Sequence, residues 1–408
     1  MLARVSEVRI KMSQHLARSS PVLLLMIAYL AFISLGLPDT LIGVAWPSVR
    51  DHFDLPQSAI AFIFFGTGCS YFVSSFFTGR LVHVLGIGVL LAASSALVAL
   101  SGFGFGLAPL WAVFATSSLL HGLGSGAIDG GLNHYAAHHF SAKHMNWLHA
   151  CYAVGATLGP LIMTGVITWH GSWRMGYLSV AVILLSLALL FASTRRKWAA
   201  PKRVHPEEEQ EPSAAAGMMV TLRQRVVWLQ VLLFFVYTGL EVTVGQWSFT
   251  VLTESRGILK ETAGLWVTMY WGSLAAGRIL FGFMVEWVGI DLLIRSSMLL
   301  SLTGAILFAL DVSAAVSAVS LAILGLGLAA IFPCMMTQTP KRLGKSMAGH
   351  AIGFQVSAAM LGAAALPSLS GILAEWWGLR TIGIASVAMA AGLFLLHEAL
   401  LLGDRRRL

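Results

Sequence analysis

Long apolar runs separated by short polar segments make up most of the chain. Each run holds about 20 or more mostly apolar residues, the length that a helix needs to cross a bilayer. Twelve runs predict transmembrane helices near residues 21–46, 57–80, 84–106, 108–137, 147–170, 174–194, 226–252, 262–286, 290–310, 313–337, 347–374 and 380–402. The pattern therefore predicts an all-α membrane protein.

One polar segment, residues 195–225, interrupts the pattern between the sixth and seventh runs. It contains RRKW, PKRVHPEEEQEP and SAAAG, a composition that buries too little apolar surface to order itself. We expect three parts: a six-helix bundle over 1–194, a cytoplasmic linker over 195–225, and a second six-helix bundle over 226–408.

A weak internal repeat relates the two bundles. GRLVHVLG (79–86) and GFMVEWVG (282–289) lie 203 residues apart, after the second and eighth runs, and Gly36-Leu37 matches Gly239-Leu240 at the same offset. Two parallel repeats predict two pseudo-symmetric bundles with a central site between them, which opens to each side in turn.

Composition and charge fit this interpretation. Of 408 residues, 57% are hydrophobic and 11% charged, against roughly 25% charged in a soluble domain. If both termini lie in the cytoplasm, 20 of the 26 Lys and Arg fall in cytoplasmic segments and five fall on the opposite side of the membrane. The net charge of +8 is therefore explained by the orientation of the chain in the membrane and does not indicate nucleic-acid binding. We expect a monomeric multi-pass protein of the cytoplasmic (inner) membrane with both termini cytoplasmic.

Three further expectations concern the first helix, the cysteines and three tryptophans. The apolar run from Pro21 to Trp46 is too long for a cleavable signal and should remain as the first helix. The three cysteines lie far apart in apolar stretches and are expected to be small buried residues. Interfacial positions are expected for Trp173, Trp376 and Trp377.

Four charged residues lie within the predicted spans: Asp39, Asp129, Glu241 and Arg278. Such charges cost about 2.5 to 3.5 kcal/mol at a helix centre, so they should face the bundle interior and serve function. Removal from water favours the neutral form of a carboxyl group, which makes Asp39 and Asp129 the leading proton-coupling residues. The alternative is an acid at a helix end that faces water or caps an ion pair.

Glu241 and Arg278 leave two interpretations open. They can pair across the seventh and eighth helices as a structural or gating ion pair, or one of them can contact substrate. Glu241 is also a proton-coupling candidate. His149, in the fifth run, is expected to relay protons. The neighbouring histidines, His134, His138, His139 and His144, lack a metal-binding motif, so we expect no metal site.

The eight-residue strings resemble the loop 2–3 signature of the major facilitator superfamily. His83 stands where the first copy of that signature has an acid, and Glu286 keeps the acid in the second copy. The resemblance implies gating or ion-pair roles for His83, Glu286 and Arg278.

Longer strings resemble the fucose/glucose–proton symporter branch of this superfamily: GLPDTLIGVAWP, GSGAIDGGLN, YTGLEVTVGQW, YWGSLAAGR, FPCMM and GFQVSAAMLGAAALPSLSG. The resemblance implies proton-coupled uptake of a small polar solute, often a monosaccharide, with the proton as coupling ion and no other cofactor. It points to the same two acids, Asp39 and Asp129.

A sugar needs neutral amides for its hydroxyl groups and aromatic rings for its apolar faces. Six residues of these types lie in the spans and are the predicted substrate contacts: Asn133, Gln246, Trp247, Tyr270, Trp271 and Gln355. For the two tryptophans, a core or interfacial position is equally compatible with the sequence.

Three other functions compete with uptake of a polar solute. Efflux of a metabolite or amphipathic drug is the main alternative, because GPLIMTG (159–165) loosely resembles an efflux signature of the fifth helix. An enzyme is disfavoured because the chain shows no nucleophile motif, HExxH or phosphate loop. A channel is disfavoured by the two-bundle design. The prediction is a secondary active transporter.

Overall fold

The computed structural model describes residues 21–140, 142–198 and 218–405, and these residues form helices without a strand. The all-α prediction is confirmed. The basic N-terminus, most of the predicted linker and the last two arginines lie outside the described residues. At the edges of the linker, the structure adds a short 3-10 turn, η2 (Arg195–Trp198), and a short helix, α9 (Met218–Leu222).

Six spans form the N-terminal half of the molecule. The first is broken into two helices and the second begins with a 3-10 turn, while the others are continuous. Their bounds are α2 (Pro21–Asp39) with α3 (Leu41–Phe53), η1 (Gln57–Ile60) with α4 (Ala61–Leu85), α5 (Ile87–Leu107), α6 (Trp111–His139), α7 (Ala142–His170) and α8 (Trp173–Thr194).

Six more spans form the C-terminal half. The first of them ends in a π-helical turn, and the fourth is broken between Leu328 and Ile331. Pro333 lies in the first turn of the helix after the break, where proline is tolerated because its missing N–H has no intrahelical partner. Their bounds are α10 (Arg225–Thr250) with η3 (Val251–Ser255), α11 (Lys260–Val288), α12 (Ile290–Leu310), α13 (Ala314–Leu328) with α14 (Ile331–Leu343), α15 (Lys345–Trp377) and α16 (Arg380–Arg405).

Ten of these spans are long and apolar enough to cross a membrane, judged over the described residues by length and composition. The other two, α6 and α11, are 29 residues long each. Their polar residues, which include Asp129 in α6 and Arg278 in α11, lower the mean hydropathy. The two spans that fall short of this criterion therefore carry residues of the predicted site.

The internal repeat corresponds to matching turns in the structure. Gly86 and Gly289 join α4 to α5 and α11 to α12, with φ of +75° and +81°, a backbone region that favours glycine. Each glycine caps the preceding helix, because its N–H bonds to the carbonyl of Val82 or Val285. The turns at residues 86 and 289 have the same geometry in both halves.

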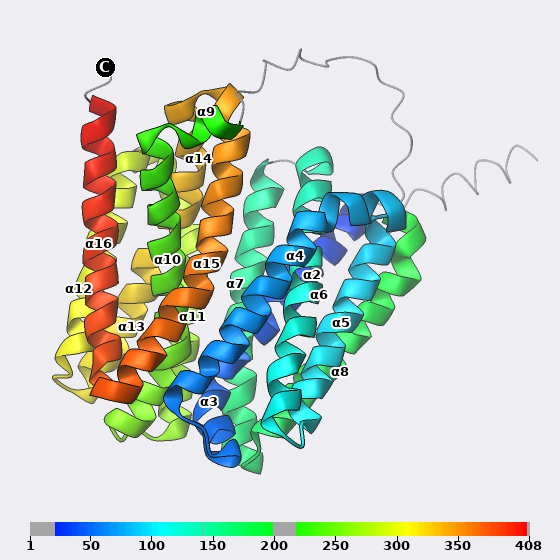
Figure 1. Cartoon of the computed structure of the whole chain (residues 1–408), viewed down its shortest axis with the longest axis vertical. Helices are drawn as coiled ribbons and strands as arrows, with labels where there is room; N and C mark the ends of the chain where they lie inside the picture. Colours follow the sequence, from blue (N-terminus) through cyan, green and yellow to red (C-terminus); the bar gives the residue numbers. More distant parts are fainter. Residues whose placement is uncertain (1–20, 141, 199–217, 406–408) are drawn as a thin grey trace, which may run out of the picture.

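The two halves contact each other at the end of the molecule that carries α3, which we call the α3 end. There Arg50 Nη1 lies 3.0 Å from Glu254 Oε2, and Gln57 donates to the same oxygen at 3.0 Å. At the opposite end, the linker end, the helices of the two halves diverge (Figure 1). Gly349 and Gly353 of α15, near the linker end, have open space where a side chain would be.

Two expectations about single residues differ in part from the structure. Trp173 begins α8 at the end of a span, but it is 6% exposed and packs among aromatic rings such as Phe114, at 5.6 Å between ring centroids, so its ring is covered by the protein. Trp376 and Trp377 are exposed as expected. Cys334 is buried, but Cys69 is exposed, because it lies on a face of α4 that no other helix covers.

Candidate functional site

A break in the first span places Asp39 in the N-terminal half. α2 ends at this residue, one position after Pro38, and α3 begins two residues later. The Asp39 carboxylate accepts hydrogen bonds from Tyr152 Oη of α7 and from His121 Nε2 of α6, both at 2.9 Å. His121 is 6% exposed, and its second nitrogen, Nδ1, is buried without a partner.

Close packing of α2 against α7 brings Tyr152 to Asp39. A Cβ atom on Gly36 would lie 2.1 Å from the Tyr152 carbonyl oxygen, and one on Gly155 would lie 2.2 Å from that of Ile33. Only glycine fits where two helices approach this closely. Thr40 adds a hydrogen bond to the Ala156 carbonyl at 2.9 Å.

The second acid, Asp129, is held in the same way on α6. Its carboxylate accepts from Tyr71 Oη of α4 at 2.6 Å and from Asn133 Nδ2, one turn along, at 2.9 Å. A Cβ atom on Gly126 would lie 2.4 Å from the Tyr71 carbonyl oxygen, so glycine here lets α4 and α6 meet. The 129/133 pair therefore shares one helix face, as its spacing predicts.

These two groups, Asp39 with His121 and Tyr152 and Asp129 with Tyr71 and Asn133, are called the N-half acid clusters below. These hydrogen-bond partners include no lysine or arginine. Each acid is thus surrounded by groups that can donate a hydrogen bond without carrying a permanent charge.

The C-terminal half holds a different arrangement around Glu241 of α10. Arg278 Nη2 of α11 lies 3.5 Å from the Glu241 carboxylate, and Tyr237 Oη donates a hydrogen bond to the same carboxylate. Tyr270 Oη donates to the Glu241 carbonyl oxygen at 2.8 Å. Of the two interpretations that the sequence left open, the structure therefore has the ion pair between Glu241 and Arg278.

Gln246 connects the halves. Its Nε2 donates to the Asp39 carbonyl oxygen at 2.9 Å, while its Oε1 is buried without a partner. A Cβ atom on Gly43 would lie 2.8 Å from that Oε1. Residues 43 and 246 are themselves 203 positions apart, so equivalent points of the two halves touch here.

The other predicted substrate contacts differ in whether their polar atoms are free. Asn133 Oδ1 and Trp271 Nε1 are buried without a hydrogen-bond partner. Trp247 Nε1, by contrast, donates to the Pro367 carbonyl at 2.9 Å. Gln355 is fully buried and bonds to Gln230 at 3.0 Å and to Thr339.

The remaining predicted residues are not among the hydrogen-bond partners described above for the acids. His149 of α7 is exposed and its ring contacts Phe32 edge-on, at 5.4 Å between centroids. His83 is exposed near the end of α4. Glu286 belongs to α11, but its side chain lies outside the described part of the structure.

Sequence reasoning missed the partners of the acids: His121, Tyr71, Tyr152 and Tyr237. One signal was present, since a histidine and three tyrosines in mid-span need partners for their polar atoms. The histidines near loop 4–5 have separate contacts, such as His144 with Tyr29 Oη at 2.9 Å. No group of three or more His, Cys, Asp or Glu among the described residues is placed to hold a metal ion.

Comparison with known proteins agrees with this architecture. The chain is 24% identical over 386 residues to the human Sodium-dependent glucose transporter 1, covering 84% of this chain and 72% of that protein. It is 24% identical over 325 residues to the Bacillus subtilis Glucose/mannose transporter GlcP, covering 76% and 78%.

Among solved structures, a bacterial homolog of the human lysosomal transporter Spinster, in an inward-facing and unoccupied conformation, superimposes with a TM-score of 0.79 at 13% identity, over 95% of this chain and 98% of that one. The family model described as Major Facilitator Superfamily matches residues 28–365 and 247–408. The chain is therefore a membrane transporter that belongs to the major facilitator superfamily.

Proposed function

We propose that this transporter couples the movement of a sugar or similar small polar solute to protons, in symport, through the N-half acid clusters. The observation that carries the proposal is the hydrogen bonding of Asp39 and Asp129 by groups without a permanent charge within the spans. A carboxylate without a fixed cation beside it can gain and lose a proton during each cycle, because its protonation leaves no cation unpaired.

The immediate surroundings of the two acids favour a proton over a sodium ion. Sodium sites in transporters are built from several oxygen ligands that point their lone pairs at the ion. Around Asp39 and Asp129, the neighbouring hydroxyl, amide and imidazole groups direct hydrogens at the carboxylates. His121 adds a second group that can hold the proton, since its Nε2 touches Asp39.

Three of the predicted substrate contacts retain free polar atoms and are the ones we assign to the solute. They are Asn133 Oδ1, Gln246 Oε1 and Trp271 Nε1. Buried polar groups without partners are uncommon and need an explanation. Sugar hydroxyl groups can donate to the two amide oxygens and accept from the Trp271 N–H. The two sugar-transporting relatives support this class of solute.

The Lys and Arg distribution makes the linker end cytoplasmic. Because the halves contact each other at the α3 end and diverge at the linker end, the conformation is then inward-facing. In the other conformation, the contacts of Arg50 and Gln57 with Glu254 must break, so these ion-pair and hydrogen-bond contacts form the outer gate in this proposal.

Uptake into proteoliposomes tests the proposal. Purified protein is reconstituted, and accumulation of labelled glucose, mannose and fucose is followed under an inward proton gradient, an inward sodium gradient or no gradient. The proposal expects accumulation with the proton gradient at sodium concentrations equal on both sides.

Two results would refute it. Accumulation that requires the sodium gradient would show that sodium, and not the proton, is the coupling ion. Absence of gradient-driven uptake for every monosaccharide would show that the solute is not a monosaccharide.

A further inference from the structure

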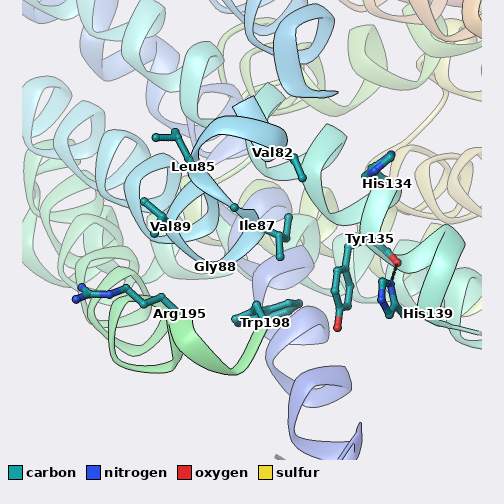
Figure 2. A pocket seen from close by; sticks show the side chains of 11 residues that line it. Val82, Leu85, Ile87, Gly88, Val89, His134, Tyr135, His139, Arg195 and Trp198 are labelled. Carbon is teal, nitrogen blue, oxygen red and sulfur yellow. Dashed lines mark hydrogen bonds between the residues drawn. The ribbon is translucent and has the colours of Figure 1, made fainter. Parts of the chain in front are cut away.

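A cavity of about 430 Å³ lies at the linker end of the N-terminal half, away from the acid clusters. This volume falls within the range of small-molecule sites, roughly 300–1,000 Å³. The first turn of α5, the last turns of α4 and α6, and η2 surround it (Figure 2). It is lined by Val82, Leu85, Gly86, Ile87, Gly88, Val89, His134, Tyr135, His139, Arg195 and Trp198.

The sequence builds this cavity through two glycines. Gly86, with φ of +75°, reverses the chain between α4 and α5. A Cβ atom on Gly88 would lie 2.2 Å from the Arg195 carbonyl oxygen, so only glycine lets η2 lie against the start of α5. Arg195 and Trp198 are thereby held beside the first turn of α5.

One donor in the lining is buried and unused. Trp198 is 2% exposed, and its Nε1 has no hydrogen-bond partner. The ring contacts Tyr135 edge-on, at 5.1 Å between centroids. A buried N–H group without an acceptor is rare in folded proteins, and an acceptor bound in the cavity would satisfy it.

A second donor depends on His139. Its Nδ1 lies 2.8 Å from the Tyr135 carbonyl oxygen, and a carbonyl can only accept, so Nδ1 carries the hydrogen. The other nitrogen, Nε2, becomes a donor when the ring takes up a proton. Stacking on Tyr135, at 4.0 Å between centroids and 7° between planes, fixes the ring in place (Figure 2).

The charge around the cavity is positive. No lining residue is acidic, and within residues 61–198 the sole acid is Asp129, which is already bonded to Tyr71 and Asn133. Arg195 lines the cavity, and Arg196 and Lys197 follow it in η2. The side chains of Leu85 and Val89, 42% and 40% exposed, continue the lining onto the apolar surface of the spans.

We propose that this cavity binds the phosphate of an anionic phospholipid. Basic groups at the end of spans attract anionic headgroups, and the unused Trp198 N–H and His139 supply hydrogen bonds to phosphate oxygens. The exposed faces of Leu85 and Val89 receive the start of the acyl chains. A free inorganic phosphate would match the polar groups but not this apolar surface.

Thermal unfolding of the full chain in detergent, after removal of lipid, tests the proposal, because a ligand of the native state raises the midpoint. The protein is titrated with phosphatidylglycerol, phosphatidylcholine or inorganic phosphate. Phosphatidylglycerol alone is expected to raise the midpoint. Trp198→Phe should weaken its apparent affinity roughly tenfold, the value of one hydrogen bond to a charged group. Arg195→Gln should weaken it roughly fivefold, the value of one basic residue beside an anionic headgroup.

Matched controls are Arg380→Gln, which removes an exposed charge at the α3 end, and Trp287→Phe, which removes a tryptophan N–H on a side chain that is 89% exposed. Both should keep the wild-type affinity. Equal responses to phosphatidylcholine, or unchanged affinity in both cavity variants, would overturn the proposal. Equal stabilisation by inorganic phosphate would overturn the assignment to a lipid. If Trp198→Phe does not fold, the affinity of Arg195→Gln for phosphatidylglycerol still tests the proposal, because Arg195 is exposed.

Discussion

The two halves share a fold but surround the carboxylates within their spans with different partners. In the N-terminal half, Asp39 and Asp129 accept hydrogen bonds from tyrosine, histidine and asparagine. In the C-terminal half, Glu241 lies beside Arg278, a permanent cation. An acid with neutral partners can change its protonation at modest cost, whereas loss of charge on one member of an ion pair leaves the other uncompensated. The difference assigns coupling to one half and a fixed ion pair to the other.

Removal of both N-half acids should have the largest effect. With one coupled proton and an inward gradient of about one pH unit, the wild type should accumulate sugar roughly tenfold, because each 1.4 kcal/mol corresponds to a factor of ten. The double variant Asp39→Asn/Asp129→Asn should reach equal concentrations on both sides and still exchange sugar. Retained accumulation in labelled-sugar uptake would remove the coupling role of these acids.

Neutralisation of Glu241 should instead act on stability. Glu241→Gln leaves Arg278, a buried cation, without its partner and should cost about 3–5 kcal/mol in the free energy of unfolding. The double variant Glu241→Gln/Arg278→Gln should recover much of that loss. Thermal unfolding measures both. A stable Glu241→Gln protein that no longer couples sugar uptake to protons would show that Glu241 also acts in coupling, and would contradict the assigned difference between the halves.

The two amides Gln355 and Asn133 separate structural from binding roles. Gln355→Leu leaves Gln230 and Thr339 without their partner and should lower stability by about 1–3 kcal/mol with unchanged KM. Asn133→Leu removes the free Oδ1 and should raise KM. Initial-rate uptake together with thermal unfolding reports both quantities, and a raised KM in Gln355→Leu would contradict the assignment.

Loss of one hydrogen bond to an N-half acid should have the smallest effect. Tyr71→Phe removes the donor to Asp129, and this donor favours the charged carboxylate. Protonation then becomes easier, so the alkaline limb of the uptake–pH profile should move upward by roughly one pH unit. Tyr177→Phe, which removes a hydroxyl from a buried tyrosine of α8 that packs against Phe105, is the control and should leave the profile in place.

The sequence predicts the architecture well, for physical reasons. A bilayer requires long apolar runs, so the twelve spans follow from hydropathy. It also predicts which acids lie inside. Their partners His121, Tyr71 and Tyr152 come from other helices, and the closeness that brings them in depends on packing at positions such as Gly36 and Gly126. The sequence supplies the members of each cluster but not the three-dimensional pairing.

The most direct test of the central claim is proton movement itself. Proteoliposomes that contain the protein are loaded with a pH-sensitive dye, and sugar is added outside without any imposed ion gradient. Internal acidification is recorded for the wild type, Asp39→Asn/Asp129→Asn and Glu241→Gln/Arg278→Gln. Sugar should acidify the lumen in the wild type and in the 241/278 variant, and leave it unchanged in the 39/129 variant. Acidification that persists in the 39/129 variant and disappears in the 241/278 variant would place coupling in the other half.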